Sequence, residues 1–162
     1  MGGCLLKIVL LTIVSNNEPW FQKARELYTE KINYMAKFEV EAIKASKIDR
    51  ANAEQKKKLE SEMLLKALKP NDFVVLLDER GKALDSLRLA QWFERENSQS
   101  TSKRMVFIIG GAFGVDEDIK KRAQLTLQLG PWTLNHLVAQ TVLLEQIYRM
   151  LTIIKGLPYH NA

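Results

Sequence analysis

Cysteine and histidine are scarce in this sequence. Its 162 residues include one cysteine, Cys4, and two histidines, His136 and His160. A single cysteine cannot close a disulfide within the chain, which excludes a disulfide-stapled scaffold. One cysteine and two histidines are also too few for a Cys/His zinc site, so we predict that the protein works without a metal.

Long apolar runs are missing as well. The longest run near the start covers residues 8–14, far short of the roughly 20 residues that a membrane-spanning helix needs. A signal peptide would begin with basic residues, whereas the first charge here, Lys7, adjoins the apolar run and no small-residue cleavage site follows. We therefore expect a cytoplasmic protein with no membrane partner.

Neither sign of charge dominates. The chain has 24 Lys and Arg against 19 Asp and Glu, a net charge of +5 with a sequence pI near 9.3. A mild basic excess suits contact with nucleic-acid phosphates, and an ordinary solvated surface almost equally well. The length and the 46% of hydrophobic residues are typical of one globular domain over residues 1–162.

Two kinds of apolar segment alternate along the chain. Short runs rich in Ile, Val and Leu predict strands, and apolar residues at helical spacing predict helices. The strands are expected at residues 5–14, 38–42, 73–77, 104–109 and 125–129, and the helices at 18–35, 51–68, 85–96, 116–124 and 134–155. This alternation predicts an α/β fold with a mainly parallel sheet flanked by helices.

The patterning also predicts where some elements lie. The strict alternation over residues 38–42 is typical of a strand near a sheet edge, whereas the run over 73–77 is apolar on both faces and predicts a central strand. The helix over 51–68 is expected to bury Leu59, Met63, Leu64 and Leu68, and the helix over 85–96 to turn Leu84, Leu87, Ala90 and Phe93 inward.

Ligands of such sheets bind at the carboxyl ends of the strands, which directs attention to residues 77–82 and 110–114. The second segment, Gly110-Gly111-Ala112-Phe113-Gly114, has neither the G-x-G-x-x-G spacing of dinucleotide-binding folds nor a P-loop pattern. Its glycines either let a ligand approach the backbone closely or only turn the chain. We favour the ligand site.

Residues 129–136 form a second unusual segment. Gly130-Pro131 makes a bent, stiff backbone, and Trp132 with the flanking leucines offers either a slot for a purine ring or a contribution to the core, which composition favours. His136 begins the last helix, whose N-cap is expected at Asn135 or Thr133.

The last helix and the tail carry further polar groups. Glu145 and Arg149 are spaced as a helix-surface ion pair. Tyr159 and His160 lie at a chain end, where they either fray or bind a flipped base.

Four segments, in this order, carry a resemblance to a known family. They are residues 77–82 (LDERGK), 107–114 (FIIGGAFG), 133–136 (TLNH) and 143–160, which runs from LLEQIYR to GLPYH. The set resembles the ribosomal RNA large subunit methyltransferase H family of the SPOUT class. Its members methylate N3 of pseudouridine-1915 in helix 69 of 23S ribosomal RNA.

The resemblance implies a homodimer whose substrate is the assembled ribosome, and a C-terminal trefoil knot within about residues 73–162. The knot would hold S-adenosylmethionine, with no metal. The family pattern implies cofactor contacts at Leu77, Gly110, Leu129, Gly130, Pro131, Trp132, Thr133 and Leu134.

The resemblance also implies the candidates for chemistry. His160, Tyr159 and His136 are candidates for removing the N3 proton, the two tail residues first because a mobile chain end can close over a base. Arg149 is a candidate for binding phosphate or stabilising developing oxygen charge. One departure from the family pattern is Gln140, where bacterial members usually carry Arg. If that Arg contacts RNA, Gln140 would weaken the contact, because Gln has no charged guanidinium.

Three alternatives remain at this point. The chain could be a catalytically silent RNA-binding protein of the same fold, or a SPOUT enzyme that acts on another RNA such as tRNA. It could also be a flavin or NAD enzyme, which the glycine spacing disfavours.

Overall fold

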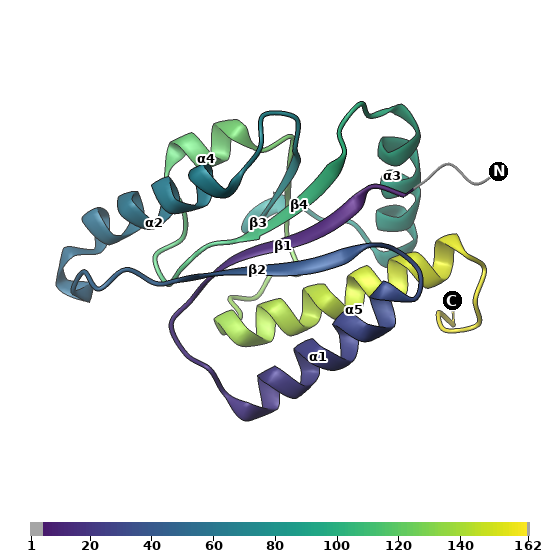
Figure 1. Cartoon of the computed structure of the whole chain (residues 1–162), viewed down its shortest axis with the longest axis horizontal. Coiled ribbons are helices and arrows are strands. Elements are labelled where there is room, and N and C mark those ends of the chain that lie inside the picture. Colours follow the sequence, from purple (N-terminus) through teal and green to yellow (C-terminus); the bar gives the residue numbers. More distant parts are fainter. Residues whose placement is uncertain (1–4, 162) are drawn as a thin grey trace.

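The computed structural model describes residues 5–161, so Cys4 lies outside the described residues. Its centre is a five-stranded sheet in the order β2-β1-β4-β3-β5, in which every pair is parallel (Figure 1). The strands are β1 (Lys7–Val14), β2 (Phe38–Lys44), β3 (Phe73–Lys82), β4 (Arg104–Ile109) and β5 (Leu125–Leu127). The predicted α/β fold with a parallel sheet is confirmed, and the trefoil knot stays a prediction.

Helices cover both faces of the sheet. They are α1 (Pro19–Asn33), α2 (Ala53–Ala67), α3 (Ser86–Gln99), α4 (Glu117–Arg122) and α5 (His136–Ile154), with a short 3-10 turn over Arg50–Asn52 before α2. Figure 1 shows α2 and α4 on one side of the strands and α1 and α5 on the other. Each βαβ crossover carries a helix to a face, so every strand inside the sheet needs apolar residues on both faces.

Strand β1 illustrates this two-sided burial. Leu10 packs into the core shared with α1, α3 and α5, whereas its neighbours Val9 and Leu11 pack into the core shared with α2 and α4. All three side chains are fully buried. Strand β2 lies at one edge of the sheet, as its alternating sequence predicts, and β3 lies inside it.

Two of the predicted helix faces are partly wrong. Helix α2 buries Lys56, Glu60, Ser61 and Leu64, whereas Leu59 is 39% exposed. Helix α3 buries Leu89, Ala90, Trp92 and Phe93, and Leu87 is 44% exposed. The error in α2 has a physical cause, because this helix packs in part against polar backbone in the loops that follow the strands.

Helix α5 is the one helix among the described residues that is long and apolar enough to cross a membrane by length and composition. The core helix of a globular protein meets the same criterion. Helix α5 packs between α1 and α3, and Leu143, Leu144, Ile147 and Met150 on it are fully buried.

A buried ion network ties the sheet together at the start of β4. The Arg104 guanidinium donates two hydrogen bonds to the Asp72 carboxylate, at 2.9 and 2.7 Å, and a third to Glu41 at 3.1 Å. Burial of Asp72 opposes ionisation, but hydrogen bonds from Arg104 and from the Lys69 N–H outweigh it and lower the pKa of the carboxyl group. Arg104 and Asp72 are 7% and 3% exposed, so neither charge has water as an alternative partner.

We expect Arg104→Met to lower the free energy of unfolding by about 3–5 kcal/mol, because it leaves the Asp72 carboxylate buried without its counter-charge. Urea unfolding at neutral pH measures the change. Arg95→Met is the matched control, since Arg95 is 59% exposed and a surface change of this kind stays within about 0.5 kcal/mol. Equal losses for the two variants would contradict the role of the network.

Candidate functional site

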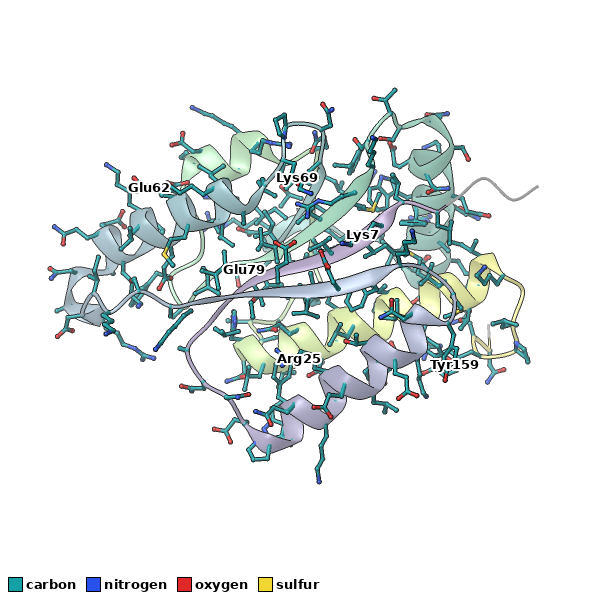
Figure 2. All side chains as sticks on the ribbon, viewed as in Figure 1. Lys7, Arg25, Glu62, Lys69, Glu79 and Tyr159 are labelled. Atoms are coloured by element: carbon teal, nitrogen blue, oxygen red, sulfur yellow. The ribbon has the colours of Figure 1, made fainter. Side chains whose placement is uncertain are left out.

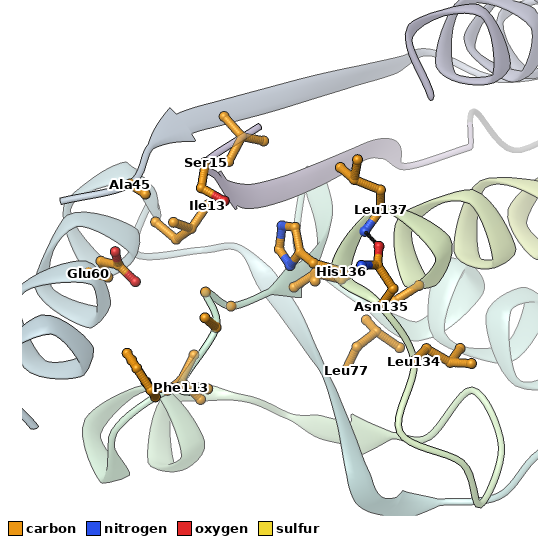
Figure 3. A pocket seen from close by; sticks show the side chains of 18 of the residues that line it. Ile13, Ser15, Ala45, Glu60, Leu77, Phe113, Leu134, Asn135, His136 and Leu137 are labelled. Atoms are coloured by element: carbon orange, nitrogen blue, oxygen red, sulfur yellow. Dashed lines mark hydrogen bonds between the residues drawn. The ribbon is translucent and has the colours of Figure 1, made fainter. Parts of the chain in front are cut away.

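A cleft of about 1300 Å³ opens where β1, β3 and β4 end. Its walls come from the segments after β1, β2, β4 and β5, from residues 77–80 of β3, from one side of α2 and from the start of α5. Figure 3 shows His136 pointing into the cleft. Seven of the eight residues expected to contact a cofactor line the cleft: Leu77, Gly110, Leu129, Gly130, Trp132, Thr133 and Leu134. The eighth, Pro131, is exposed and does not line it.

The glycine segment after β4 is a tight turn at the floor of the cleft. The N–H of Gly114 donates to the carbonyl of Gly111 at 3.0 Å. Residues 109–115 all line the cleft, so the segment both turns the chain and presents backbone to a ligand. The two interpretations of these glycines are therefore compatible.

The segment that follows β5 is fastened to the end of β3 at two points. The Gln128 side-chain amide donates to the carbonyl of Gly81 at 2.9 Å, and the Thr133 hydroxyl donates to Glu79 at 2.9 Å. Between them Gly130 has a φ of +145°, a conformation that side chains other than glycine rarely adopt. The loop over residues 129–134 is thus held at both ends beside Leu77.

Trp132 lies on this loop and is 78% exposed. The expectation that it joins the core is wrong, because the bend at residues 130–131 carries the loop out over the cleft and away from the sheet. Phe113, on the facing glycine segment, is 37% exposed. Two aromatic faces are therefore available at the cleft.

The cleft side of α5 begins with a capped histidine. The Asn135 side chain accepts hydrogen bonds from the N–H groups of Leu137 and Val138, as an N-cap does. His136 follows as the first helical residue, with its Nε2 3.4 Å from the Thr12 hydroxyl at the end of β1. Burial lowers the pKa of His136, although a backbone hydrogen bond at Ile13 and the charge of Glu60 act in the opposite direction.

The tail is docked onto the other end of α5. The Tyr159 hydroxyl donates to Glu145 at 3.1 Å, and Arg149 pairs with the same carboxylate at 2.6 Å. Arg149 also contacts the His160 ring at 3.1 Å and lies over the Tyr159 ring. The predicted Glu145–Arg149 pair is confirmed, and fraying of residues 159–160 is contradicted.

The four candidate catalytic residues form two separate groups. His136 lines the cleft, whereas Arg149, Tyr159 and His160 do not. Along α5, Arg149 comes 13 positions after His136, which amounts to about 20 Å of helix. Figure 2 likewise shows Tyr159 well apart from Glu79, the residue bonded to Thr133 in the cleft.

Gln140, one turn after His136, is fully buried. Neither atom of its side-chain amide has a hydrogen-bond partner within residues 5–161. A side chain in this interior position does not reach RNA. Within this chain, Gln140 therefore does not make the RNA contact considered for an Arg at the same position.

Sequence reasoning missed three polar residues in the cleft wall, namely Ser46, Lys56 and Glu60. Lys56 and Glu60 are 9% and 1% exposed and form an ion pair at 3.0 Å. Their i,i+4 spacing on a charged helix is typical of a solvated surface pair, so the sequence carries no signal that they are interior. Within residues 5–161 no group of three or more His, Cys, Asp or Glu is placed to hold a metal ion.

Comparisons with known proteins give consistent matches. A profile of the family described as "Predicted SPOUT methyltransferase" matches residues 6–160. Two proteins named ribosomal RNA large subunit methyltransferase H are similar over 96% of this chain and 99% of their own length. The one from Bdellovibrio bacteriovorus is 46% identical and the one from Phocaeicola vulgatus 38% identical.

A solved structure is also similar. The crystal structure of a probable methyltransferase from Bordetella pertussis Tohama I superposes with a TM-score of 0.56, over 90% of this chain and 95% of that one. The two sequences are 15% identical, so the likeness is one of fold alone.

The lowered pKa of His136 predicts a pH dependence of stability. In the unfolded chain a histidine binds a proton near pH 6.5, whereas the folded protein keeps His136 neutral to lower pH. The unfolded state then holds more protons, so stability contributed at neutral pH is lost as the pH falls below about 6.5. Urea unfolding between pH 7.5 and 5 should show a smaller loss for His136→Gln than for the wild type. Identical losses in the two proteins would contradict the lowered pKa.

Proposed function

Because the chain belongs to the SPOUT methyltransferase family, we propose that it transfers the methyl group of S-adenosylmethionine to large-subunit ribosomal RNA. Its relatives are named ribosomal RNA large subunit methyltransferase H, which indicates the RNA substrate. One observation in this chain carries the proposal: the segments 77–80, 109–115 and 129–139, far apart in sequence, meet in one cleft. Membership of this family also sets aside the flavin or NAD enzyme.

The cleft is chemically suited to S-adenosylmethionine. Leu77, Leu129 and Leu134 are partly buried apolar side chains in its wall, which suits an adenine ring. Gly110 has no space for a side chain, because a Cβ there would lie 2.7 Å from Val115 Cγ1, so a ligand meets bare backbone. We propose that these residues, with Gly130, Pro131, Trp132 and Thr133, hold the cofactor.

The bound cofactor supplies a methyl group already activated by its sulfonium charge. The protein then has to align the acceptor nitrogen and remove its proton. His136 is the histidine that lines the cleft, and its lowered pKa keeps the ring neutral at neutral pH, able to accept that proton. Trp132 and Phe113 offer exposed aromatic faces on which a base can stack.

The docked tail is too far from the cleft of its own chain to act there. We propose that the protein is a homodimer in which Tyr159 and His160 of one chain reach the cleft of the other. The Glu145–Arg149 pair fixes the position of both tail residues, so the tail is presented as a rigid group. Burial raises the pKa of the Tyr159 phenol, and Glu145 raises it further, so the hydroxyl stays protonated as a hydrogen-bond donor.

The target within the RNA is the finer part of the proposal. We infer N3 of pseudouridine-1915 in helix 69 of 23S ribosomal RNA, methylated on the assembled ribosome in the cytoplasm. Residues 5–161 form one sheet with its covering helices, so we propose that the dimer surface around each cleft recognises the RNA.

The proposed reaction is tested by methyl transfer from tritiated S-adenosylmethionine to ribosomes that lack the helix 69 methyl group, with free large subunits in parallel. Incorporation should map to the pseudouridine and favour the assembled ribosome. Removing residues 159–162 should lower kcat/KM by about 100-fold or more, because the acceptor is no longer aligned, while cofactor affinity is unchanged. Cofactor binding without transfer by the wild type would favour a silent RNA-binding protein, and transfer to tRNA another SPOUT enzyme.

The shared site is tested by mixing two inactive chains. One lacks residues 159–162, and the other carries Leu134→Arg, which fills the cleft and prevents cofactor binding. Random pairing makes half of the dimers mixed, each with one complete site, so co-expression should restore about a quarter of wild-type activity if the protein is a symmetric dimer. No recovery in mixed dimers shown to form would contradict a site built from two chains.

A further inference from the structure

A buried carboxylate lies in the wall of the cleft and takes no part in the chemistry described so far. Glu60 projects from α2 toward the cleft, with His136 beyond the opening (Figure 3). Glu60 and its partner Lys56 are almost fully buried. Burying such a pair costs desolvation energy that the ion pair often fails to recover, so stability alone does not account for its presence.

One oxygen of Glu60 holds the segment that follows β2. Its Oε1 accepts hydrogen bonds from the backbone N–H of Ser46 at 3.0 Å and from the Ser46 hydroxyl at 3.3 Å. The Lys56 ammonium donates to the carbonyl of Ser46 at 2.7 Å. The ion pair thereby satisfies both the N–H and the carbonyl of one cleft-lining residue.

The other oxygen of Glu60 lies against the glycine segment. A Cβ on Gly111 would overlap Glu60 Oε2, so a side chain at this position would require the carboxylate to shift. The neighbouring residue on α2, Ser61, accepts a hydrogen bond from the N–H of Asp116 at 3.0 Å. Two adjacent residues of α2 thus contact the glycine segment at its start and just beyond its end.

We propose that Glu60, neutralised by Lys56, is a positioning residue for methyl transfer that holds residues 110–116 at a fixed separation from Ser46 across the cleft. The role rests on the proposed function, since residues 110–114 form part of the cofactor site. It depends on shape and hydrogen bonding more than on net charge, because Lys56 offsets the carboxylate.

The first test compares Glu60→Ala with Glu62→Ala, a change on the exposed side of the same helix (Figure 2). In the cofactor-free protein, Glu60→Ala should speed amide exchange over residues 110–116, because the segment opens locally more often. It should weaken S-adenosylmethionine binding by about tenfold, because apparent affinity falls in proportion to the population of the binding-competent conformation. Glu62→Ala should change neither quantity.

A pair of conservative changes separates positioning from folding. Lys56→Met with Glu60→Gln removes both charges at nearly constant volume and keeps an oxygen for Ser46, so exchange and cofactor affinity should stay near wild type. The contact itself is tested by Gly111→Ala, which should weaken cofactor binding. Glu60→Ala should then weaken binding by less than it does in the wild type, because the two changes act on one contact and are not additive.

Each outcome is distinguishable. Faster exchange in Glu60→Ala with unchanged cofactor affinity would overturn the proposal, as would wild-type exchange in a folded Glu60→Ala protein. A purely additive Gly111→Ala/Glu60→Ala pair would overturn the contact on which it rests. If the wild type binds no S-adenosylmethionine, the proposed function fails, and the amide-exchange comparison still decides whether Glu60 holds the segment.

Discussion

The parallel direction of all five strands is the constraint on which the rest of this structure depends. Because β3, β4 and β5 run the same way, their carboxyl ends lie at the same end of the sheet. Residues 77–80, 109–115 and 129–139 meet there, although as many as 62 residues separate the first from the last. The apolar strands that bury both faces of the sheet therefore also create the cleft.

Much of the fold and of the cleft lining could be predicted from the sequence. Buried parallel strands are continuous apolar runs, so the strand over 104–109 was predicted with its observed bounds. The strand-end rule located Leu77 and Gly110, and the side chain of Asn135 marked the start of α5. These features are local, and short stretches of sequence determine them.

Other parts of the site were out of reach because they depend on contacts between distant segments. Lys56 and Glu60 have the spacing of a surface pair, and only the approach of Ser46 and Gly111 to α2 makes them interior. Trp132 is a large apolar residue flanked by leucines, which usually indicates a place in the core, but the bend at residue 130 carries it outward. Tyr159 docks on the Glu145–Arg149 pair, which the sequence predicts. The distance of Tyr159 from the cleft, however, follows only from the length of α5.

Helix α5 is a rigid element of fixed length between the cleft and the docked tail. His136 stands at its first residue, and the residues that hold the tail stand on its later turns. One residue inserted within this helix would rotate the tail by about 100° and shift it by about 1.5 Å relative to the cleft. Natural variation in chain length should therefore avoid this helix between residues 136 and 149 and collect in segments such as the loop before β4, where an added residue changes no spacing that the site depends on.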